Sequence, residues 1–103
     1  MEAPTVRIFP DIKQKYVLVR VIRDGEEELL LWGNPHIEWH KDIVQEMTDA
    51  GHEVVEALGG GWLMPKTEDD VVYIWGMSDR LGPAPINLIR ELLGDKLREK
   101  EPQ

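Results

Sequence analysis

The 103-residue sequence contains no cysteine, a single phenylalanine and only three histidines. The missing cysteines exclude disulfides, thiolate catalysis and cysteine-based zinc sites. Basic residues are also scarce, because 12 lysines and arginines stand against 20 aspartates and glutamates, for a formal net charge of -8. This excess of negative charge repels nucleic acids and anionic membrane surfaces unless the cations gather on one face. We therefore expect neither nucleic acid nor membrane as a partner.

Long hydrophobic runs are missing as well. No apolar stretch approaches the roughly 20 residues that a bilayer requires, and residues 1–4 lack a basic segment that leads into an apolar one. Together with the absence of cysteine, this favours a cytoplasmic protein. What is present is an ordinary globular balance of 42% hydrophobic and 31% charged residues. The length suits one domain, residues 1–103.

The first third of the chain predicts an N-terminal arm followed by a β-hairpin. Residues 1–14 carry two prolines and little periodicity. Residues 15–22 are rich in β-branched and aromatic side chains, which is typical of a strand. Asp24-Gly25 marks a turn, and residues 29–32 resume strand composition, so that the two strands should pair.

An amphipathic helix follows the predicted hairpin. Ile37, His40, Val44 and Met47 share one face, and Gly51 supplies a stop signal. The start of this helix has two readings. Asn34-Pro35 has the composition of an N-cap followed by a first-turn proline, whereas a later start would leave His40 in the first turn.

The second half predicts two more strands and a last helix. Residues 52–58 suit a strand that ends at Gly59-Gly60-Gly61, and residues 71–75 suit a central, very apolar strand. Apolar residues recur at helical spacing over residues 84–97, and residues 98–103 form a solvated tail. The order strand, strand, helix, strand, strand, helix predicts a single α+β domain, in which two α-helices pack on a mixed β-sheet.

Several stretches resemble, in order and spacing, the protein histidine phosphatases of the janus/ocnus family. They are Lys15-Tyr16-Val17-Leu18-Val19-Arg20-Val21, Trp39-His40-Lys41-Asp42-Ile43, Leu58-Gly59-Gly60-Gly61, Tyr73-Ile74-Trp75-Gly76-Met77-Ser78 and Leu81-Gly82-Pro83-Ala84. The resemblance implies the phosphohistidine phosphatase-like fold, here without an obvious closing strand after the last helix. It also favours the later helix start close to His40, with residues 34–37 in a lead-in loop.

The same resemblance implies a metal-independent phosphatase that hydrolyses phosphohistidine or a related phosphoramidate without a cofactor. His40 matches the family's lone histidine, which acts as base or nucleophile. A neutral imidazole that titrates near pH 6.5 suits either role. The implied partner is a phosphohistidine-containing protein or a small phosphoramidate, and phosphate or sulfate is expected in the pocket. No metal site is expected, because His36 and His40 lack the zinc-protease pattern around them.

By the same resemblance Lys15 and the loop that holds Ser78 contribute to phosphate binding. The family commonly has arginines where this chain has Trp32 and Trp62, and Arg80 is a candidate to replace one of these cations. Without such a replacement the chain would be a non-catalytic phosphate-binding module of the same fold. Plainer readings stay open: Ser78 as a loop serine with local hydrogen bonds, Lys15 and Arg80 as surface charges, and the two tryptophans as core or rim aromatics.

Overall fold

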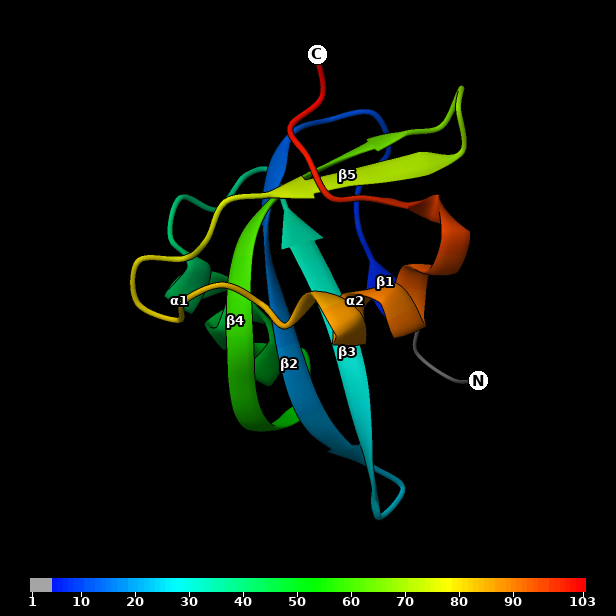
Figure 1. Cartoon of the computed structure of the whole chain (residues 1–103). Helices are drawn as coiled ribbons and strands as arrows, with labels where there is room; N and C mark the ends of the chain where they lie inside the picture. Colours follow the sequence, from blue (N-terminus) through cyan, green and yellow to red (C-terminus); the bar gives the residue numbers. More distant parts are fainter. Residues whose placement is uncertain (1–4) are drawn as a thin grey trace.

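A computed structural model describes residues 5–103, which form a mixed six-stranded sheet with a helix on each face (Figure 1). The α+β fold expected from the sequence is thereby confirmed. The strands are β1 (Val6–Arg7), β2 (Gln14–Arg23), β3 (Glu26–Asn34), β4 (Glu53–Lys66), β5 (Val71–Trp75) and β6 (Leu97–Arg98). The helices are α1 (His40–Asp49), α2 (Ile86–Leu93) and the 3-10 turn η1 (Gly94–Lys96). No helix within residues 5–103 is long and apolar enough to cross a membrane.

The strand order across the sheet is β1-β3-β2-β4-β5-β6. The four central strands are antiparallel neighbours, whereas β1 and β6 pair in parallel with β3 and β5. The predicted hairpin is confirmed, and at its tip Asp24 and Gly25 adopt the positive φ angles (53° and 80°) of a tight turn. The expectation of a sheet without a closing strand was wrong, because β6 completes one edge.

The sheet is buried on both faces, which explains why residues 15–22 are so apolar. Tyr16 and Leu18 of β2 face α2, while Val17, Val19 and Val21 face α1. In Figure 1 the two helices accordingly lie on opposite sides of the strands. On the α1 side Ile43 and Met47 are fully buried, and on the α2 side Ile89 is fully buried. The core therefore consists of two layers separated by the sheet.

The triple glycine lies inside β4 and does not end it, which corrects the predicted strand end. Gly59, Gly60 and Gly61 pair with Leu18, Val17 and Tyr16 of β2, and the register shifts just beyond them. Glycine is required here by close packing. A Cβ on Gly60 would lie 2.6 Å from the carbonyl oxygen of Tyr16 and 3.0 Å from Cδ2 of His40.

The last helix is shorter than the predicted range 84–97. It ends at Leu93, because Gly94 follows with a φ of 58°, a positive angle that leaves the helix and that glycine adopts readily. Leu97 then joins β6 and buries its side chain in the α2 layer of the core. The apolar spacing that suggested four helical turns thus serves a helix and a strand in succession.

Candidate functional site

The helix start expected from the family resemblance is confirmed, because α1 begins at His40. The expected lead-in loop over residues 34–37 was wrong at its first residue, because Asn34 is the last residue of β3. The side-chain oxygen of Asn34 accepts the N–H of His36 at 2.8 Å. Trp39 takes the N-cap position in extended conformation without a side-chain cap, and its carbonyl accepts the N–H of Asp42 at 3.0 Å. Within residues 5–103 no acceptor is found for the backbone N–H groups of His40 and Lys41. Two donors at the positive end of the helix dipole are therefore available to an anion.

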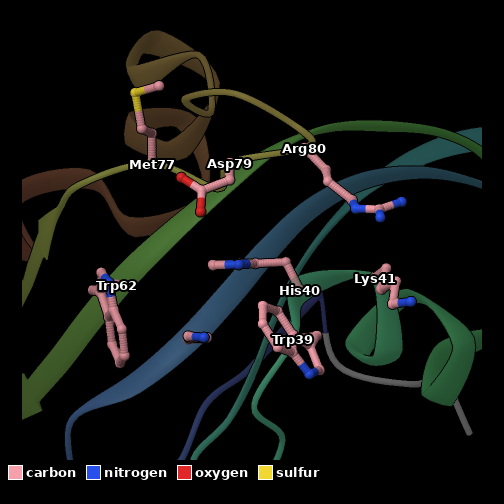
Figure 2. A pocket seen from close by; sticks show the side chains of 8 residues that line it. Trp39, His40, Lys41, Trp62, Met77, Asp79 and Arg80 are labelled. Carbon is pink, nitrogen blue, oxygen red and sulfur yellow. The ribbon is translucent and has the colours of Figure 1, made fainter.

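A hollow of about 430 Å³ opens beside this helix end. We call it the His40 pocket. In Figure 2 the His40 ring lies at its centre, Trp62 and Asp79 lie on one side, and Lys41 and Arg80 lie on the other. The lining comes from β2, the start of α1, β4 and the loop after β5, so residues far apart in sequence meet here. The complete lining is Lys15, Trp39, His40, Lys41, Trp62, Met77, Asp79 and Arg80.

One nitrogen of the His40 ring is fixed by the main chain of β4. Nε2 lies 2.9 Å from the carbonyl oxygen of Gly61. A carbonyl can only accept a hydrogen bond, so Nε2 carries a proton and donates it. In the neutral ring Nδ1 is then the nitrogen with the free lone pair, and within residues 5–103 it has no hydrogen-bond partner. The ring is held in one tautomer that leaves a base or nucleophile available.

Burial of the half-exposed ring lowers the pKa of His40 below the usual value of 6.5. The hydrogen bond to Gly61 opposes this shift, the positive charge of Lys15 adds to it, and the negative charge of Asp79 opposes it. The net direction is downward, because the charged form loses hydration in the pocket wall. His40 is therefore neutral at pH 7, as both a base and a nucleophile must be.

Lys15 reaches the pocket from the start of β2. In the sheet it pairs with Asn34 on one side and with Trp62 on the other. Its ammonium group donates to the carbonyl of Glu38 and lies 5.5 Å from the ring centre of Trp39 and 5.2 Å from that of Trp62. The predicted lysine is thus brought to His40 and is held between two indole rings.

Trp62 forms a rigid wall of the pocket. Lys13 and Lys15 both approach its ring, at 4.6 Å and 5.2 Å from the centre. A Cβ on Gly76 would lie 3.1 Å from the indole Cδ1 of Trp62. The ring therefore packs where it does because residue 76 has no side chain. Of the two readings left open for Trp62, the structure gives the rim aromatic.

Trp32, by contrast, is a core aromatic and does not line the His40 pocket. Only 8% of it is exposed, and it packs with the α1 layer of the core. Its indole N–H donates to Glu46 at 2.9 Å, and the guanidinium of Arg7 lies 4.1 Å from a ring centre. The same carboxylate also accepts from Arg7 at 2.7 Å and from Asn34 at 3.1 Å, which ties α1 to β3.

Ser78 lies close to His40 but does not line the pocket. It is 2% exposed, its hydroxyl accepts the N–H of Leu81 at 3.1 Å, and its own N–H donates to Gly60 at 3.0 Å. The N–H of Gly82 donates to Ser78, and that of Gly60 donates to Gly82. Ser78 therefore makes the local hydrogen bonds of a loop serine, and these bonds fix the loop that presents Asp79 and Arg80.

Four lining residues were not singled out as site residues by the sequence reasoning: Trp39, Lys41, Met77 and Asp79. Lys41 and Trp39 could have been inferred from their position next to His40. Met77 and Asp79 likewise lie next to the predicted residues Ser78 and Arg80, but their direction in the loop after β5 could not be read from the sequence. Among residues 5–103 no three His, Asp or Glu side chains gather in a way that could hold a metal ion.

Fold and pocket define a small α+β protein with a neutral histidine, free main-chain donors and cations around one hollow. A comparison with protein-family models gives a match to the Janus/Ocnus family (Ocnus) over residues 1–101. The chain therefore belongs to the Janus/Ocnus family.

Proposed function

We propose that this protein is a metal-independent phosphatase that hydrolyses phosphohistidine or a related phosphoramidate in the His40 pocket. The carrying observation is that His40 and Lys41 line one hollow, while Nδ1 of His40 and the backbone N–H groups of both residues have no hydrogen-bond partner within residues 5–103. Such a helix end binds phosphate through its donors and its dipole. The base and the donors for the transferred group thus come from consecutive residues.

The charge of the pocket supports the same conclusion. The whole chain is strongly acidic, yet Lys15, Lys41 and Arg80 line the pocket and face a single acidic residue, Asp79. Cations set around a phosphoryl group stabilise the charge that develops in its transfer. A local positive field within a negative protein also steers small anions to this hollow and away from the rest of the surface.

The reaction can follow two routes that use the same nitrogen. As a base, Nδ1 of His40 takes a proton from water while the water oxygen attacks phosphorus and the P–N bond breaks. As a nucleophile, Nδ1 attacks phosphorus itself, and water then hydrolyses the phosphorylated His40. In both routes the electron pair of the P–N bond leaves with the substrate nitrogen, which takes up a proton from water unless the leaving group is already protonated. The products are the free amine or imidazole and inorganic phosphate.

The alternative function is a non-catalytic phosphate-binding module. Trp62 favours it, because this side chain lines the pocket where the family commonly has an arginine. A wall without that cation binds the developing charge less strongly. Such a module would bind phosphate in the His40 pocket with no turnover.

The test is phosphate release from phosphohistidine by the wild-type protein and by His40→Asn, with His52→Asn as the matched control. His52 packs against Trp32, at 5.1 Å between ring centres, and lies outside the His40 pocket. We expect His40→Asn to lose at least about 100-fold in turnover, as loss of a positioned base does, while circular dichroism stays unchanged. Absence of turnover by the wild-type protein would refute the phosphatase, and full turnover by His40→Asn would refute the role of His40 in it. Phosphate binding without wild-type turnover would establish the binding module. The cytoplasmic location remains a prediction.

A further inference from the structure

A second hollow of about 280 Å³ lies beside the His40 pocket. We call it the Lys13 hollow. Both hollows have Lys15 and Trp62 in their linings, so they meet where the start of β2 pairs with β4. In the sheet Lys15 is the direct partner of Trp62, and Trp62 is in turn the partner of Trp75 on β5. A molecule with one group in the His40 pocket can therefore place a neighbouring group in the Lys13 hollow.

Two ammonium groups share the indole ring between these hollows. The ammonium of Lys13 lies 4.6 Å from the ring centre of Trp62 and 6.0 Å from that of Trp75. The ammonium of Lys15 lies 5.2 Å from the ring centre of Trp62. Among residues 5–103 no carboxylate lies within ion-pair distance of either lysine. In a chain with a net charge of -8, two neighbouring cations without a carboxylate partner mark a local site for an anion.

The main chain on both sides of Lys13 is held by the buried side chain of Gln14. Its amide oxygen accepts the N–H of Phe9 at 3.0 Å, and its amide nitrogen donates to the carbonyl oxygens of Phe9 and Ile12, both at 2.8 Å. Gln14 is 1% exposed, and a Cβ on Gly33 would lie 2.4 Å from its amide oxygen. The arm that leads into β2 is therefore fixed, and the exposed Lys13 starts from a defined position.

The charge of the Lys13 hollow suits a carboxylate better than a phosphate dianion. Two ammonium groups face one acidic lining residue, Glu38, which leaves a formal charge of about +1. Lys15 also donates to the main-chain carbonyl of Glu38, and this bond holds its ammonium group between the two hollows. The His40 pocket, with three cations and one acidic residue, keeps the stronger positive field for the phosphoryl group.

We infer that the Lys13 hollow binds a carboxylate of the same molecule whose phosphoryl group lies in the His40 pocket. This inference rests on the proposed function, because it adds a second contact to the substrate of that pocket. The carboxylate is an aspartate or glutamate side chain near the phosphorylated histidine of a polypeptide, since the phosphoimidazole itself carries no second anion. Lys13 and Lys15 give it charge-assisted hydrogen bonds. The preferred substrates are then acidic segments, although the protein itself is acidic.

The rim of the His40 pocket also suits a polypeptide. Trp39 and Met77 line this pocket, and 56% of each is exposed, which makes them two of the large hydrophobic residues left at the surface. A small phosphoramidate inside the pocket would leave them in water, whereas a polypeptide that crosses the rim covers them. Burial of their apolar surface favours the longer ligand.

Binding of a stable analogue tests the inference without turnover. The probes are two peptides, acetylated and amidated at their ends, in which a triazole phosphonate replaces phosphohistidine and its P–C bond resists hydrolysis. One peptide carries glutamate at the two positions on either side of the analogue, and the other carries glutamine there. We expect the wild-type protein to bind the glutamate peptide about three- to tenfold more tightly. The acidic chain as a whole would favour the glutamine peptide, so this preference has a local cause.

Variants of Lys13 assign the preference to the Lys13 hollow. Lys13→Gln should remove most of it, and Lys13→Arg, which keeps the positive charge, should retain it. Arg90→Gln is the matched control, because it removes the same charge from an exposed residue of α2, and α2 lies on the opposite face of the sheet from α1 (Figure 1). Its preference should equal that of the wild-type protein.

The outcomes separate this inference from the proposed function. Equal binding of the two peptides, or a preference that Lys13→Gln keeps, would overturn the carboxylate site while the phosphatase stands. An equal loss in Arg90→Gln or in Lys13→Arg would also overturn it, because the cause would then be net charge or altered packing. A preference lost only in Lys13→Gln, in a wild-type protein that does not hydrolyse phosphohistidine, would keep the carboxylate site and overturn the phosphatase. Failure of both peptides to bind would overturn both.

Discussion

Gly60 is the position where the fold and the candidate site constrain each other most closely. A methyl group there would lie 2.6 Å from the carbonyl oxygen of Tyr16, 3.0 Å from Cδ2 of His40 and 3.5 Å from Cβ of Ser78. The oxygen belongs to the backbone of β2, and Tyr16 is 2% exposed, so that it cannot withdraw. The His40 ring can move, but only by giving up the hydrogen bond to Gly61.

We predict that Gly60→Ala lowers the free energy of unfolding by about 2 to 3 kcal/mol. Overpacking of a close-packed interior costs roughly 1 to 3 kcal/mol, and a clash with backbone belongs at the upper end. The smaller entropy of the unfolded alanine chain returns about 0.4 to 1 kcal/mol. For a domain of this size the corresponding fall in Tm is about 10 to 20 °C. Urea titration followed by tryptophan fluorescence measures the first value, and calorimetry measures the second.

The same substitution should release His40 from its tautomer. Imidazole 15N resonances would then change from the pattern of a ring protonated at Nε2 to that of an exchanging ring. Gly25→Ala is the control, because Gly25 has a φ of 80° at the hairpin tip and a methyl group there would meet nothing within 4 Å, so that it costs roughly 1 kcal/mol of backbone strain and leaves His40 unchanged. A loss no larger than that of Gly25→Ala, with unaltered His40 resonances, would refute the close packing on which the site geometry depends.

Three further predictions concern pH, the Glu46 cluster and Arg80. Since burial lowers the pKa of His40, the proposed phosphatase activity should persist below pH 6.5 and fall only at more acidic pH. The free energy of unfolding should decrease as pH falls from 6.5 through the folded pKa, because the unfolded chain then binds a proton that the native ring resists. NMR titration of His40 checks both, and a pKa at or above 6.5 would contradict them. Glu46→Ala should cost about 2 to 3 kcal/mol in urea unfolding, since Arg7, Trp32 and Asn34 all lose their acceptor; a cost under about 0.5 kcal/mol would be inconsistent with that cluster. Arg80→Ala should weaken phosphate binding by about three- to tenfold in calorimetric titration. Arg90→Ala, an exposed residue of α2, is the charge-matched control. Equal affinities in all three proteins would show that Arg80 takes no part in phosphate binding.

The central elements were predictable because their signals are local. The hairpin follows from an apolar strand, the Asp24-Gly25 turn and a second strand, and α1 follows from its apolar stripe. The short edge strands β1 and β6 have two residues each, which is too short for any periodicity. Their pairing is decided by the neighbours that the folded sheet offers. Gly94 ended the last helix early for a local reason, and that signal was present in the sequence.

The sequence predicted a strand end at Gly59-Gly60-Gly61, but close packing, and not strand propensity, decides which residues occupy these positions. Gly60 lies inside a central strand because Tyr16 and His40 approach it too closely for a side chain. Such a three-dimensional constraint leaves no periodic trace in the sequence.

The candidate site, like the fold, was predictable only in part. His40, Lys15 and Arg80 are brought to one pocket, and Ser78 lies behind it as a loop residue with its polar groups in use. Asp79 was missed because its direction depends on hydrogen bonds among Gly60, Ser78 and Gly82. The chemical type of a loop residue can be read from sequence, whereas its direction requires the fold.

Titration of the 15N-labelled wild-type protein with inorganic phosphate at pH 7 tests most directly whether His40 and the start of α1 form an anion site. We predict saturable shifts that are largest at the backbone amides of His40 and Lys41, together with a shift of the His40 ring. Absence of saturable shifts at these two amides, or larger shifts at a distant surface, would contradict the proposed site.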